Sequence, residues 1–374
     1  MFNFIKAFLG LTKTLNNNTN KEKVIFYSES KNYRNYFSTF FKEMIKSDKF
    51  FIQYVTSDIN DLDEFEKVKP IFVGNGIFLI IFFTIIKCKY FFMTLSNLGN
   101  HHLKKSKKCK YYIYIFHSMV STHKCYEETA FSNYDIIFTI ADYQKKELKK
   151  SEELYNLPKK KIFNVGYFYT ENMNKIVNKN LKEKNNILFA PSWNRNNKNL
   201  FNDYSIFIIN QLISHNFFVS LRTHPETLKR SNKIIKKIKK NFLSNKCFSL
   251  NTDLNNFINI EKSEVLITDD GGVGIEYAYI FKRPVIFIDY IKKIHNKNYE
   301  ELNIEPIEEK FKKSCGYKIT IDGISNLKNI IENLKHDNEK IKNNYKAFFN
   351  DYELNIKNDI IASKLATDII INKF

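Results

Sequence analysis

The chain has 374 residues, which is enough for two α/β domains of ordinary size and more than one compact core usually holds. Its hydrophobic content of 43% excludes general disorder. The formal net charge of +19 favours an anionic partner such as nucleic acid, anionic lipid or a phosphorylated substrate, although a lysine-rich coding bias would leave the same surplus. The cysteines number five, with no close pair at metal-ligand spacing, which fits a reducing compartment.

Residues 1–20 are the first predicted element, an amphipathic helical segment. No small-residue cleavage site follows it, so we do not expect a secretory signal. The pattern suits a helix that lies on a bilayer surface, and equally one that packs on the first domain. The apolar residues that share one face of this helix are Met1, Phe4, Ile5, Phe8, Leu11 and Leu15.

The most hydrophobic segment begins at Ile77. Its uncharged part, 77–86, covers half of the roughly 20 residues that a transmembrane helix needs, and Lys87 and Lys89 then interrupt it. We therefore predict a buried helix over 77–86, followed by a strand over 90–95.

From residue 22 onward, short β-branched or aromatic runs alternate with helical stretches. Seven runs, from "KVIFYSE" to "KIFNVGY", predict strands of a parallel sheet covered on both faces, and they define a first domain over 21–175. The polar stretch 171–186 is predicted as a linker. Four more strands, "NILFAPSW", "FFVSLRTHPE", "EVLITDD" and "PVIFID", define a second domain over 176–352. Residues 353–374 predict a C-terminal helix that packs back on the first domain.

Polar residues follow two of these strands where packing does not require them. His117 stands after "YYIYIF", where it suits a general base, a phosphate partner or a loop histidine bonded to backbone. Arg222 and His224 follow "FFVSL", and an arginine fork beside a histidine suits phosphate. Because Pro225 follows, a capped turn explains this second group equally well.

The stretch "LITDDGGVGIEYAYIF" places Asp269, Asp270, Gly271 and Gly272 between a strand and a helix that begins near residue 273. The glycines let backbone approach a ligand closely, and the helix N-terminus favours an anion. Two carboxylates would repel that anion, so we expect them to cap the helix and bond neighbouring loops. A metal site is disfavoured because no third ligand is close in sequence. Glu276 suits ribose hydroxyls, or is a surface glutamate.

The strand "NILFA" ends at a fourth polar group. Ser192, Arg195 and Lys198 suit contacts to phosphate, whereas Trp193 is equally well explained as a packing residue.

Together the stretches "ILFAPSW", "RTHPE" and "LITDDGGVGIEYAYIFKRPVIFID", with "IFHS" and "IFNVGYFYTE" before them, resemble the CDP-glycerol glycerophosphotransferase family over residues 110–290. The resemblance implies an α/β, GT-B-like fold with two doubly wound Rossmann-like parallel-sheet domains facing a central cleft. Family motifs Trp-His-Gly and Arg-x-His-Pro match His117 and His224. The family's Asp-Tyr-Ser-Ser is replaced by Asp269-Asp270-Gly271-Gly272.

The resemblance implies transfer of glycerol phosphate, or a related polyol phosphate, from CDP-glycerol to a hydroxyl of a cell-surface polymer such as teichoic acid or capsule, with release of CMP. CDP-glycerol is then a substrate, no cofactor is expected, and a need for a divalent metal stays open. The implied roles are catalysis for His117 and His224, donor-phosphate binding for Ser192, Arg222, Gly271 and Gly272, and nucleotide binding for Asp269, Asp270 and Glu276.

Two alternatives remain within the same fold. One is a glycosyltransferase that uses a sugar nucleotide. The other is a nucleotide-sugar 2-epimerase, which the Gly-Gly pair followed by Glu276 also resembles, although the epimerases' Gly-Thr-Arg-Pro-Glu motif is replaced here by "FYSESKNYRNY".

The resemblance also implies a cytoplasmic protein, peripheral on the inner face of the cell membrane. Its partners would be the CDP-linked donor, a lipid-linked or polymeric glycan acceptor and an anionic membrane surface. Nucleic acid is not expected, because the lysines are dispersed and no known binding motif is present.

Overall fold

The computed structural model describes residues 2–16, 19–178, 180–181, 183–194, 198–253, 257–352 and 361–374. They form two compact units, which we describe separately. Unit 1 takes in the described residues of Met1–His117, Tyr126–Asn172 and Glu353–Phe374, and unit 2 those of Ser118–Cys125 and Met173–Tyr352. The short segment 118–125 therefore groups with unit 2, although unit 1 strands precede and follow it.

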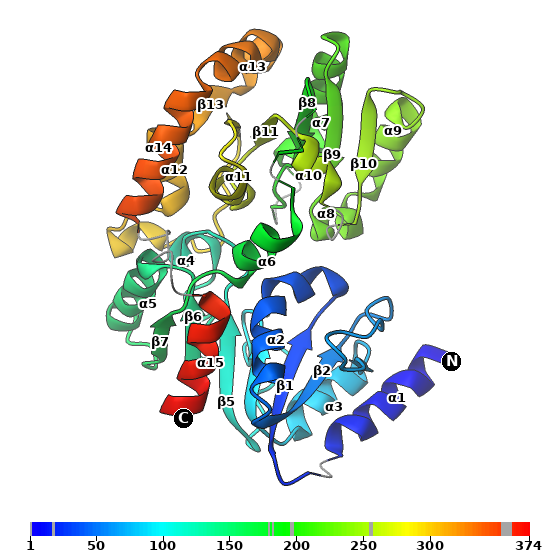
Figure 1. Ribbon diagram of the computed structural model, residues 1–374, viewed down its shortest axis with the longest axis vertical. Coiled ribbons are helices and arrows are strands. Elements are labelled where there is room, and N and C mark those ends of the chain that lie inside the picture. Colours follow the sequence, from blue (N-terminus) through cyan, green and yellow to red (C-terminus); the bar gives the residue numbers. More distant parts are fainter. Residues whose placement is uncertain are drawn as a thin grey trace. The chain divides into compact units, whose positions relative to one another are not determined.

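Unit 1 is built on a parallel sheet with the strand order β3-β2-β1-β4-β5-β6-β7 (Figure 1). Its strands read as near-continuous apolar runs because helices cover both faces of the sheet. Phe26 of β1 stacks on Phe92 of β4 with ring centroids 4.6 Å apart, and both are fully buried. The strands are β1 (Glu22–Ser28), β2 (Phe50–Thr56), β3 (Ile71–Phe72), β4 (Cys88–Met93), β5 (Cys109–Ile115), β6 (Ile136–Thr139) and β7 (Lys161–Asn164).

Two helices of unit 1 bear directly on the sequence expectations. The predicted buried helix is α3 (Ile77–Ile85), and β4 follows it, as expected. The predicted linker over 171–186 is wrong in its first part, where α6 (Phe168–Ile176) continues; Phe168 stacks on Phe40, and Met173 is buried. The other helices of this part of the chain are α1 (Phe2–Leu15), η1 (Lys31–Tyr36), α2 (Ser38–Lys46), α5 (Asp142–Leu154) and α15 (Ala362–Lys373), of which α15 packs on α2.

Among the described residues, no helix has both the length and the apolar character needed to cross a membrane.

Unit 2 has a parallel sheet with the order β10-β9-β8-β11-β12-β13, so the predicted class of two Rossmann-like parallel-sheet α/β domains is confirmed (Figure 1). The sequence missed β10 and β13 because these edge strands lack a continuous apolar run. The strands are β8 (Asn186–Phe189), β9 (Phe218–Arg222), β10 (Phe248–Asn251), β11 (Val265–Thr268), β12 (Val285–Asp289) and β13 (Tyr317–Thr320).

The helices of unit 2 are α4 (Thr122–Cys125), α7 (Leu200–Ser214), α8 (Pro225–Arg230), α9 (Asn232–Phe242), α10 (Ile258–Lys262), α11 (Val273–Phe281), η2 (Tyr299–Leu302), α12 (Ile307–Ser314), η3 (Ile321–Asn326), α13 (Leu327–His336) and α14 (Asn338–Asp351). The predicted helix start near residue 273 is thus confirmed by α11.

Candidate functional site

The strand order of unit 2 reverses between β8 and β11, which is where open parallel sheets bind ligands at the carboxyl ends of their strands. Ser192 follows β8 and Asp269 follows β11. The two loops are joined because the backbone N–H of Ser192 donates to Asp269 Oδ1 at 2.7 Å. A Cβ on Gly271 would lie 3.0 Å from Ser192 Cβ, so the loops are in close contact.

Gly272 begins α11 and lies against the segment 118–125. A Cβ at this glycine would meet Ser118 Oγ at 2.2 Å and Val120 Cγ1 at 3.0 Å. Its φ of −65° is open to any residue, so close packing explains the glycine and backbone conformation does not. Glu276, one turn further along, accepts from the N–H of Met119 at 3.4 Å. Residues 118–120 therefore lie beside the N-terminal turn of α11.

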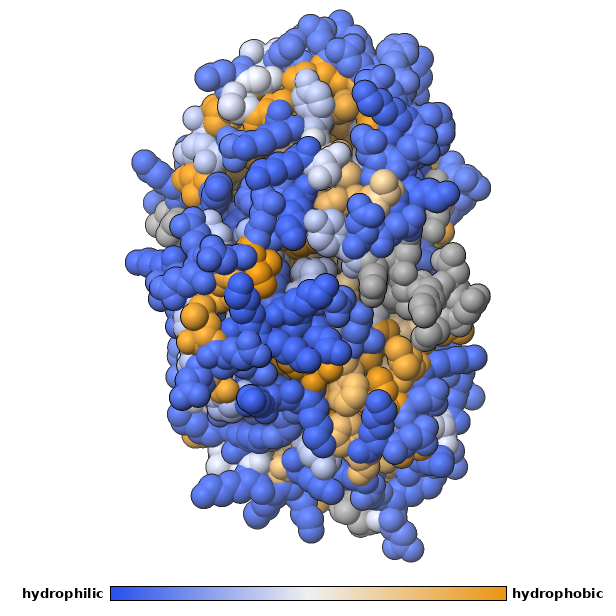
Figure 2. Space-filling view, turned by 90° about the vertical axis from the view of Figure 1, so that its left-hand side faces the viewer, coloured by the Kyte–Doolittle hydropathy of each residue, from blue (hydrophilic) through white to orange (hydrophobic). Residues whose placement is uncertain are grey.

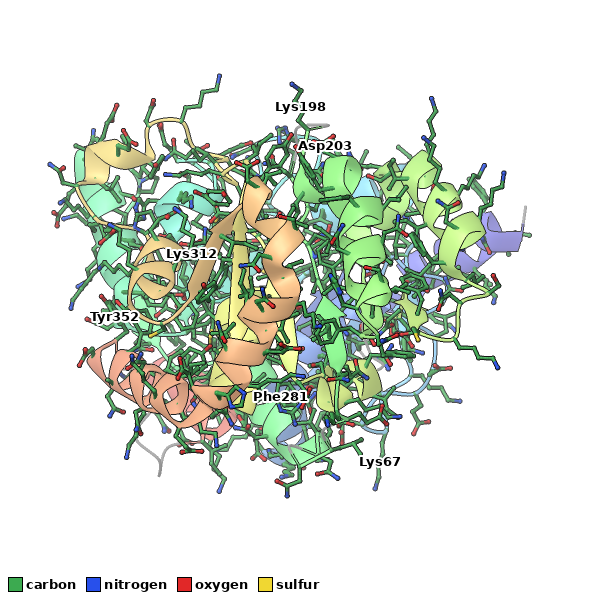
Figure 3. The ribbon with its side chains drawn as sticks, turned by 90° about the horizontal axis from the view of Figure 1, so that it is seen from above. Lys67, Lys198, Asp203, Phe281, Lys312 and Tyr352 are labelled. Atoms are coloured by element: carbon green, nitrogen blue, oxygen red, sulfur yellow. The ribbon has the colours of Figure 1, made fainter. Side chains whose placement is uncertain are left out.

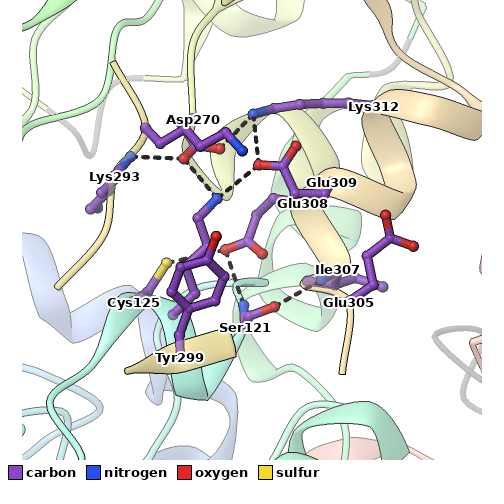
Figure 4. A network of polar contacts seen from close by, with 12 residues as sticks. Ser121, Cys125, Asp270, Lys293, Tyr299, Glu305, Ile307, Glu308, Glu309 and Lys312 are labelled. Atoms are coloured by element: carbon purple, nitrogen blue, oxygen red, sulfur yellow. Dashed lines mark hydrogen bonds and ion pairs between the residues drawn. The ribbon is translucent and has the colours of Figure 1, made fainter. Parts of the chain in front are cut away.

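Asp270 is the centre of a buried charge network within unit 2 (Figure 4). Its Oδ2 accepts from Lys124 Nζ and from the N–H of Lys293, both at 2.8 Å, and its Oδ1 pairs with Lys312 Nζ at 2.5 Å. Lys124 Nζ also contacts Glu309 Oε1 at 2.9 Å, and its side chain is only 1% exposed. Burial alone would raise the pKa of Asp270, but Lys124 and Lys312 hold it at about 2.

Glu308 ties the same segment to α12. Its Oε1 accepts from the N–H of Ser121 at 3.1 Å and lies 3.1 Å from Cys125 Sγ, while Ser121 Oγ accepts from the N–H of Ile307 at 2.8 Å. Charges and backbone bonds together therefore make residues 118–125 a fixed part of unit 2.

Asp269 differs from its neighbour in having no lysine at bonding distance among the contacts described. Burial raises the pKa of Asp269 to about 6, although the Ser192 N–H and Lys293 oppose the shift. The N-cap of α11 is Gly272, with no side-chain capping bond in the described structure. Of the two expected tasks of these aspartates, helix capping is thus not seen, whereas bonding between neighbouring loops is.

Metal ligation was the disfavoured alternative for the aspartate pair. In the part of the chain that the structure describes, no group of three or more histidine, cysteine or carboxylate side chains has a geometry that would hold a metal ion.

The end of β9 lies next to the Ser192 loop through aromatic contacts. Trp193 stacks on His224 with ring centroids 6.2 Å apart, and Arg230 Cζ lies 5.5 Å from the centre of the Trp193 ring. His224 is the N-cap of α8: its Nδ1 accepts from the N–H of Glu226 at 3.1 Å. The capped-turn interpretation of this stretch is therefore what the structure shows, and it leaves a further role for the imidazole open.

Arg222 is half-buried, with its Cζ 6.0 Å from the centre of the Phe257 ring. Lys198 is exposed and extends outward at the edge of the view in Figure 3, whereas Lys312 lies in the interior. Arg195, which the sequence also suggested as a phosphate contact, lies outside the described residues.

His117 follows β5 in unit 1 and is surrounded by tyrosines. Its Nδ1 lies 3.4 Å from Tyr114 Oη, and its ring meets those of Tyr33 and Tyr36 edge-on, with centroids 5.5 and 5.7 Å away. The structure thus gathers the remaining predicted site residues in unit 2 and places His117 in an aromatic environment in unit 1. The residues gathered in unit 2 are Ser192, Arg222, His224, Asp269, Asp270, Gly271, Gly272 and Glu276.

Four charged residues of the network were missed from the sequence: Lys124, Glu308, Glu309 and Lys312. No motif contains them, and single lysines carry no signal in a chain with 59 lysines and arginines. They are revealed only by three-dimensional contacts: the two lysines pair with Asp270, Glu309 pairs with Lys124, and Glu308 accepts from the Ser121 N–H.

Among the comparisons with known proteins, only the comparison with solved structures finds similar proteins. No family model matches the chain, and no curated protein matches it in sequence. S. aureus MnaA, solved with UDP, superposes with a TM-score of 0.63 at 12% identity, covering 93% of this chain and 96% of its own. UDP-GlcNAc 2-epimerase from Neisseria meningitidis, bound to UDP-GlcNAc, gives 0.60 at 13% identity, covering 93% and 99%.

A third similar structure is a glycosyltransferase from Rickettsia africae, with a TM-score of 0.50 at 13% identity, covering 95% of this chain and 100% of its own. At these identities the likeness shows the fold, which agrees with the two Rossmann-like sheets and the expected GT-B class.

The resemblance to CDP-glycerol glycerophosphotransferases is therefore wrong, together with the polyol-phosphate transfer, the CDP-glycerol donor and the surface-polymer role that it implied. The structural relatives are UDP-GlcNAc 2-epimerases and a glycosyltransferase, and no family model supports the resemblance. The resemblance depended on short motifs at strand ends. Parallel α/β sheets place polar and glycine residues there for many ligands, so such motifs do not define a donor.

Proposed function

We propose that this protein is an enzyme that acts on a nucleoside-diphosphate sugar, with a UDP-sugar as the first candidate. The observation that carries the proposal is the cluster at the switch point of unit 2, where the Ser192 loop and the first turn of α11 meet at the carboxyl ends of β8 and β11. The UDP ligands named for the similar MnaA and Neisseria structures favour the same ligand class here.

The chemistry of the cluster suits a diphosphate. The first N–H groups of a helix have no partner within the helix, and α11 is a nine-residue helix with its positive dipole end at Gly272. The Ser192 hydroxyl and the Arg222 guanidinium supply further donors for phosphate oxygens. Asp269 and Asp270 are assigned to holding the loops, because their described contacts are within the protein.

Glu276 and the Trp193–His224 stack are the proposed nucleoside contacts. A carboxylate accepts hydrogen bonds from ribose hydroxyls, and a half-buried indole offers an apolar face to a base. His117 remains the proposed proton-transfer residue of unit 1.

The first candidate reaction is 2-epimerisation, in which the configuration at carbon 2 of the sugar is inverted, because the Neisseria relative carries this activity in its name. Glycosyl transfer is the second candidate, and one observation in this chain favours it. At the end of β1 the chain reads Ser28-Glu29-Ser30, where the epimerases open with Gly-Thr-Arg-Pro-Glu.

Binding is tested first, by titrating the protein with UDP, CDP and GDP and following the fluorescence of Trp193, the only tryptophan. We expect UDP to bind most tightly, and Glu276→Gln to weaken UDP at least several-fold. The matched control Glu300→Gln changes an exposed glutamate of η2 and should leave UDP affinity unchanged. Absence of binding by all three nucleotides would refute the proposal.

The reaction is then identified by following UDP-GlcNAc by NMR with no acceptor present. Formation of the 2-epimer, UDP-N-acetylmannosamine, identifies an epimerase. If UDP-GlcNAc binds but is converted only after a glycan acceptor is added, the protein is a transferase. A lipid-linked glycan is the acceptor we propose for transfer, because it would be available to a protein on a membrane surface.

A further inference from the structure

Helix α1 is fixed on unit 1 by one of its faces (Figure 1). A Cβ on Gly10 would lie 1.7 Å from the carbonyl oxygen of Phe72, so the helix backbone contacts β3 directly. Ala7 and Leu11 are buried on the same side. At the helix C-terminus the carbonyl of Thr14 accepts a hydrogen bond from Lys23 Nζ at 2.5 Å. This bond satisfies one of the carbonyl groups that have no partner within the helix.

The opposite face of α1 is apolar and exposed. Phe4, Ile5, Phe8 and Leu9 are 61%, 49%, 52% and 50% exposed, and Ile77 at the start of α3 is 58% exposed. These five residues are called here the apolar patch. The rings of Phe4 and Phe8 both contact Phe78 of α3, the residue after Ile77. Single exposed apolar residues are ordinary on protein surfaces, but a group on one fixed helix marks an interaction site.

On the face of the molecule shown in Figure 2, hydrophilic residues cover most of the surface and apolar residues form separate areas. On α1 the apolar residues recur with the spacing of a helix, over the half of its circumference that unit 1 leaves uncovered.

The two stretches of sequence that carry the patch contain no acidic residue. Residues 1–21 contain Lys6, Lys13 and Lys21 and no aspartate or glutamate, and residues 67–126, which include α3, also contain none. Lys6 and Lys13 lie on α1 between its exposed and buried faces. An apolar helix face bordered by lysines is typical of helices that lie in the interface of an anionic bilayer.

We propose that the apolar patch binds the surface of an anionic phospholipid bilayer, with Phe4 and Phe8 inserted among the lipid chains and Lys6 and Lys13 near the headgroups. A second copy of this chain fits less well, because it would bring the lysines beside the two patches close together. The proposal does not depend on the nucleotide site of unit 2.

The test is co-sedimentation of the full chain with vesicles of phosphatidylcholine alone or mixed with phosphatidylglycerol. We expect binding to the mixed vesicles and little to phosphatidylcholine alone. The double variant Phe4→Ser/Phe8→Ser should bind at least about tenfold more weakly, because it removes two half-exposed aromatic side chains. Lys6→Gln/Lys13→Gln should weaken binding about tenfold or less, and only at low salt.

Phe207→Ser is the matched control, since Phe207 of α7 is 44% exposed and belongs to unit 2. It should bind vesicles like the unchanged protein. All variants should keep the circular dichroism and the nucleotide affinity of the unchanged protein, because the altered side chains are at the surface. Equal vesicle binding by Phe4→Ser/Phe8→Ser and the unchanged protein, or a dimer in solution that this variant dissociates, would overturn the proposal.

Discussion

The ends of β11 and β5 both carry predicted site residues, but the surroundings of these residues are opposite in chemistry. After β11 in unit 2, Asp270 is buried among Lys124, Lys312 and backbone N–H groups. After β5 in unit 1, His117 is half-buried among tyrosine rings. Buried charge pairs therefore surround the first end, whereas aromatic rings surround the imidazole at the second. Loss of folding stability and loss of turnover should therefore separate between the two units.

The largest effect is expected from Asp270→Asn. The amide leaves two lysines, 1% and 7% exposed, without their shared carboxylate, and breaking a buried ion pair costs about 3–5 kcal/mol of unfolding free energy. Urea denaturation followed by Trp193 fluorescence measures this in unit 2. The matched control Asp289→Asn breaks a partly exposed pair with Lys318 and should cost less than about 1 kcal/mol. Equal losses in both variants would show that the Asp270 network is not a stabilising element.

The neighbouring aspartates should show opposite pH dependence. The pKa of Asp269 is raised to about 6. Between about pH 4 and 6 this carboxyl group is therefore protonated in the folded protein and ionised in the unfolded chain. Its contribution to the unfolding free energy is on the order of 2–3 kcal/mol. This contribution is complete below about pH 4 and is lost as pH rises through 6. The pKa of Asp270 is lowered to about 2, so its contribution is present above pH 4 and is lost as pH falls through 2.

Unfolding free energy measured by Trp193 fluorescence from pH 4 to 7 tests the first half of this prediction. Asp269→Asn keeps an oxygen for the Ser192 N–H and should remove the decline between pH 4 and 6. A variant whose decline matches that of the unchanged protein would assign the pH dependence to another group.

A smaller loss is expected from Gly272→Ala. The new methyl group would overlap Ser118 Oγ, so the segment 118–120 must shift, at a cost of about 1–3 kcal/mol. Adding Ser118→Ala removes the closest atom and should restore part of the lost unfolding free energy, as measured by urea denaturation. No recovery in the double variant would mean that this contact is not the cause.

A feature of this fold could be predicted from the sequence when the residues that form it are close together in the chain. The two parallel sheets were predictable because each central strand is a local apolar run, and the α11 start was predictable from Asp-Asp-Gly-Gly before a helical pattern. The edge strands β10 and β13, and the membership of 118–125 in unit 2, were not, because they depend on contacts distant in sequence. Lys124 and Asp270, 146 residues apart, are the clearest case.

The smallest stability effect is expected from His117→Ala. Its described neighbours are tyrosine rings at 5.5 Å and beyond and one contact of 3.4 Å, so the loss of unfolding free energy should stay below about 1 kcal/mol. If the imidazole transfers a proton in turnover, UDP-GlcNAc conversion should fall by about 10²-fold or more while UDP affinity stays unchanged. Tyr33→Phe keeps the ring and removes only a hydroxyl, so it should retain most of the activity. A drop in UDP affinity for His117→Ala, or unaltered conversion, would contradict the separation of stability from chemistry between the two strand ends.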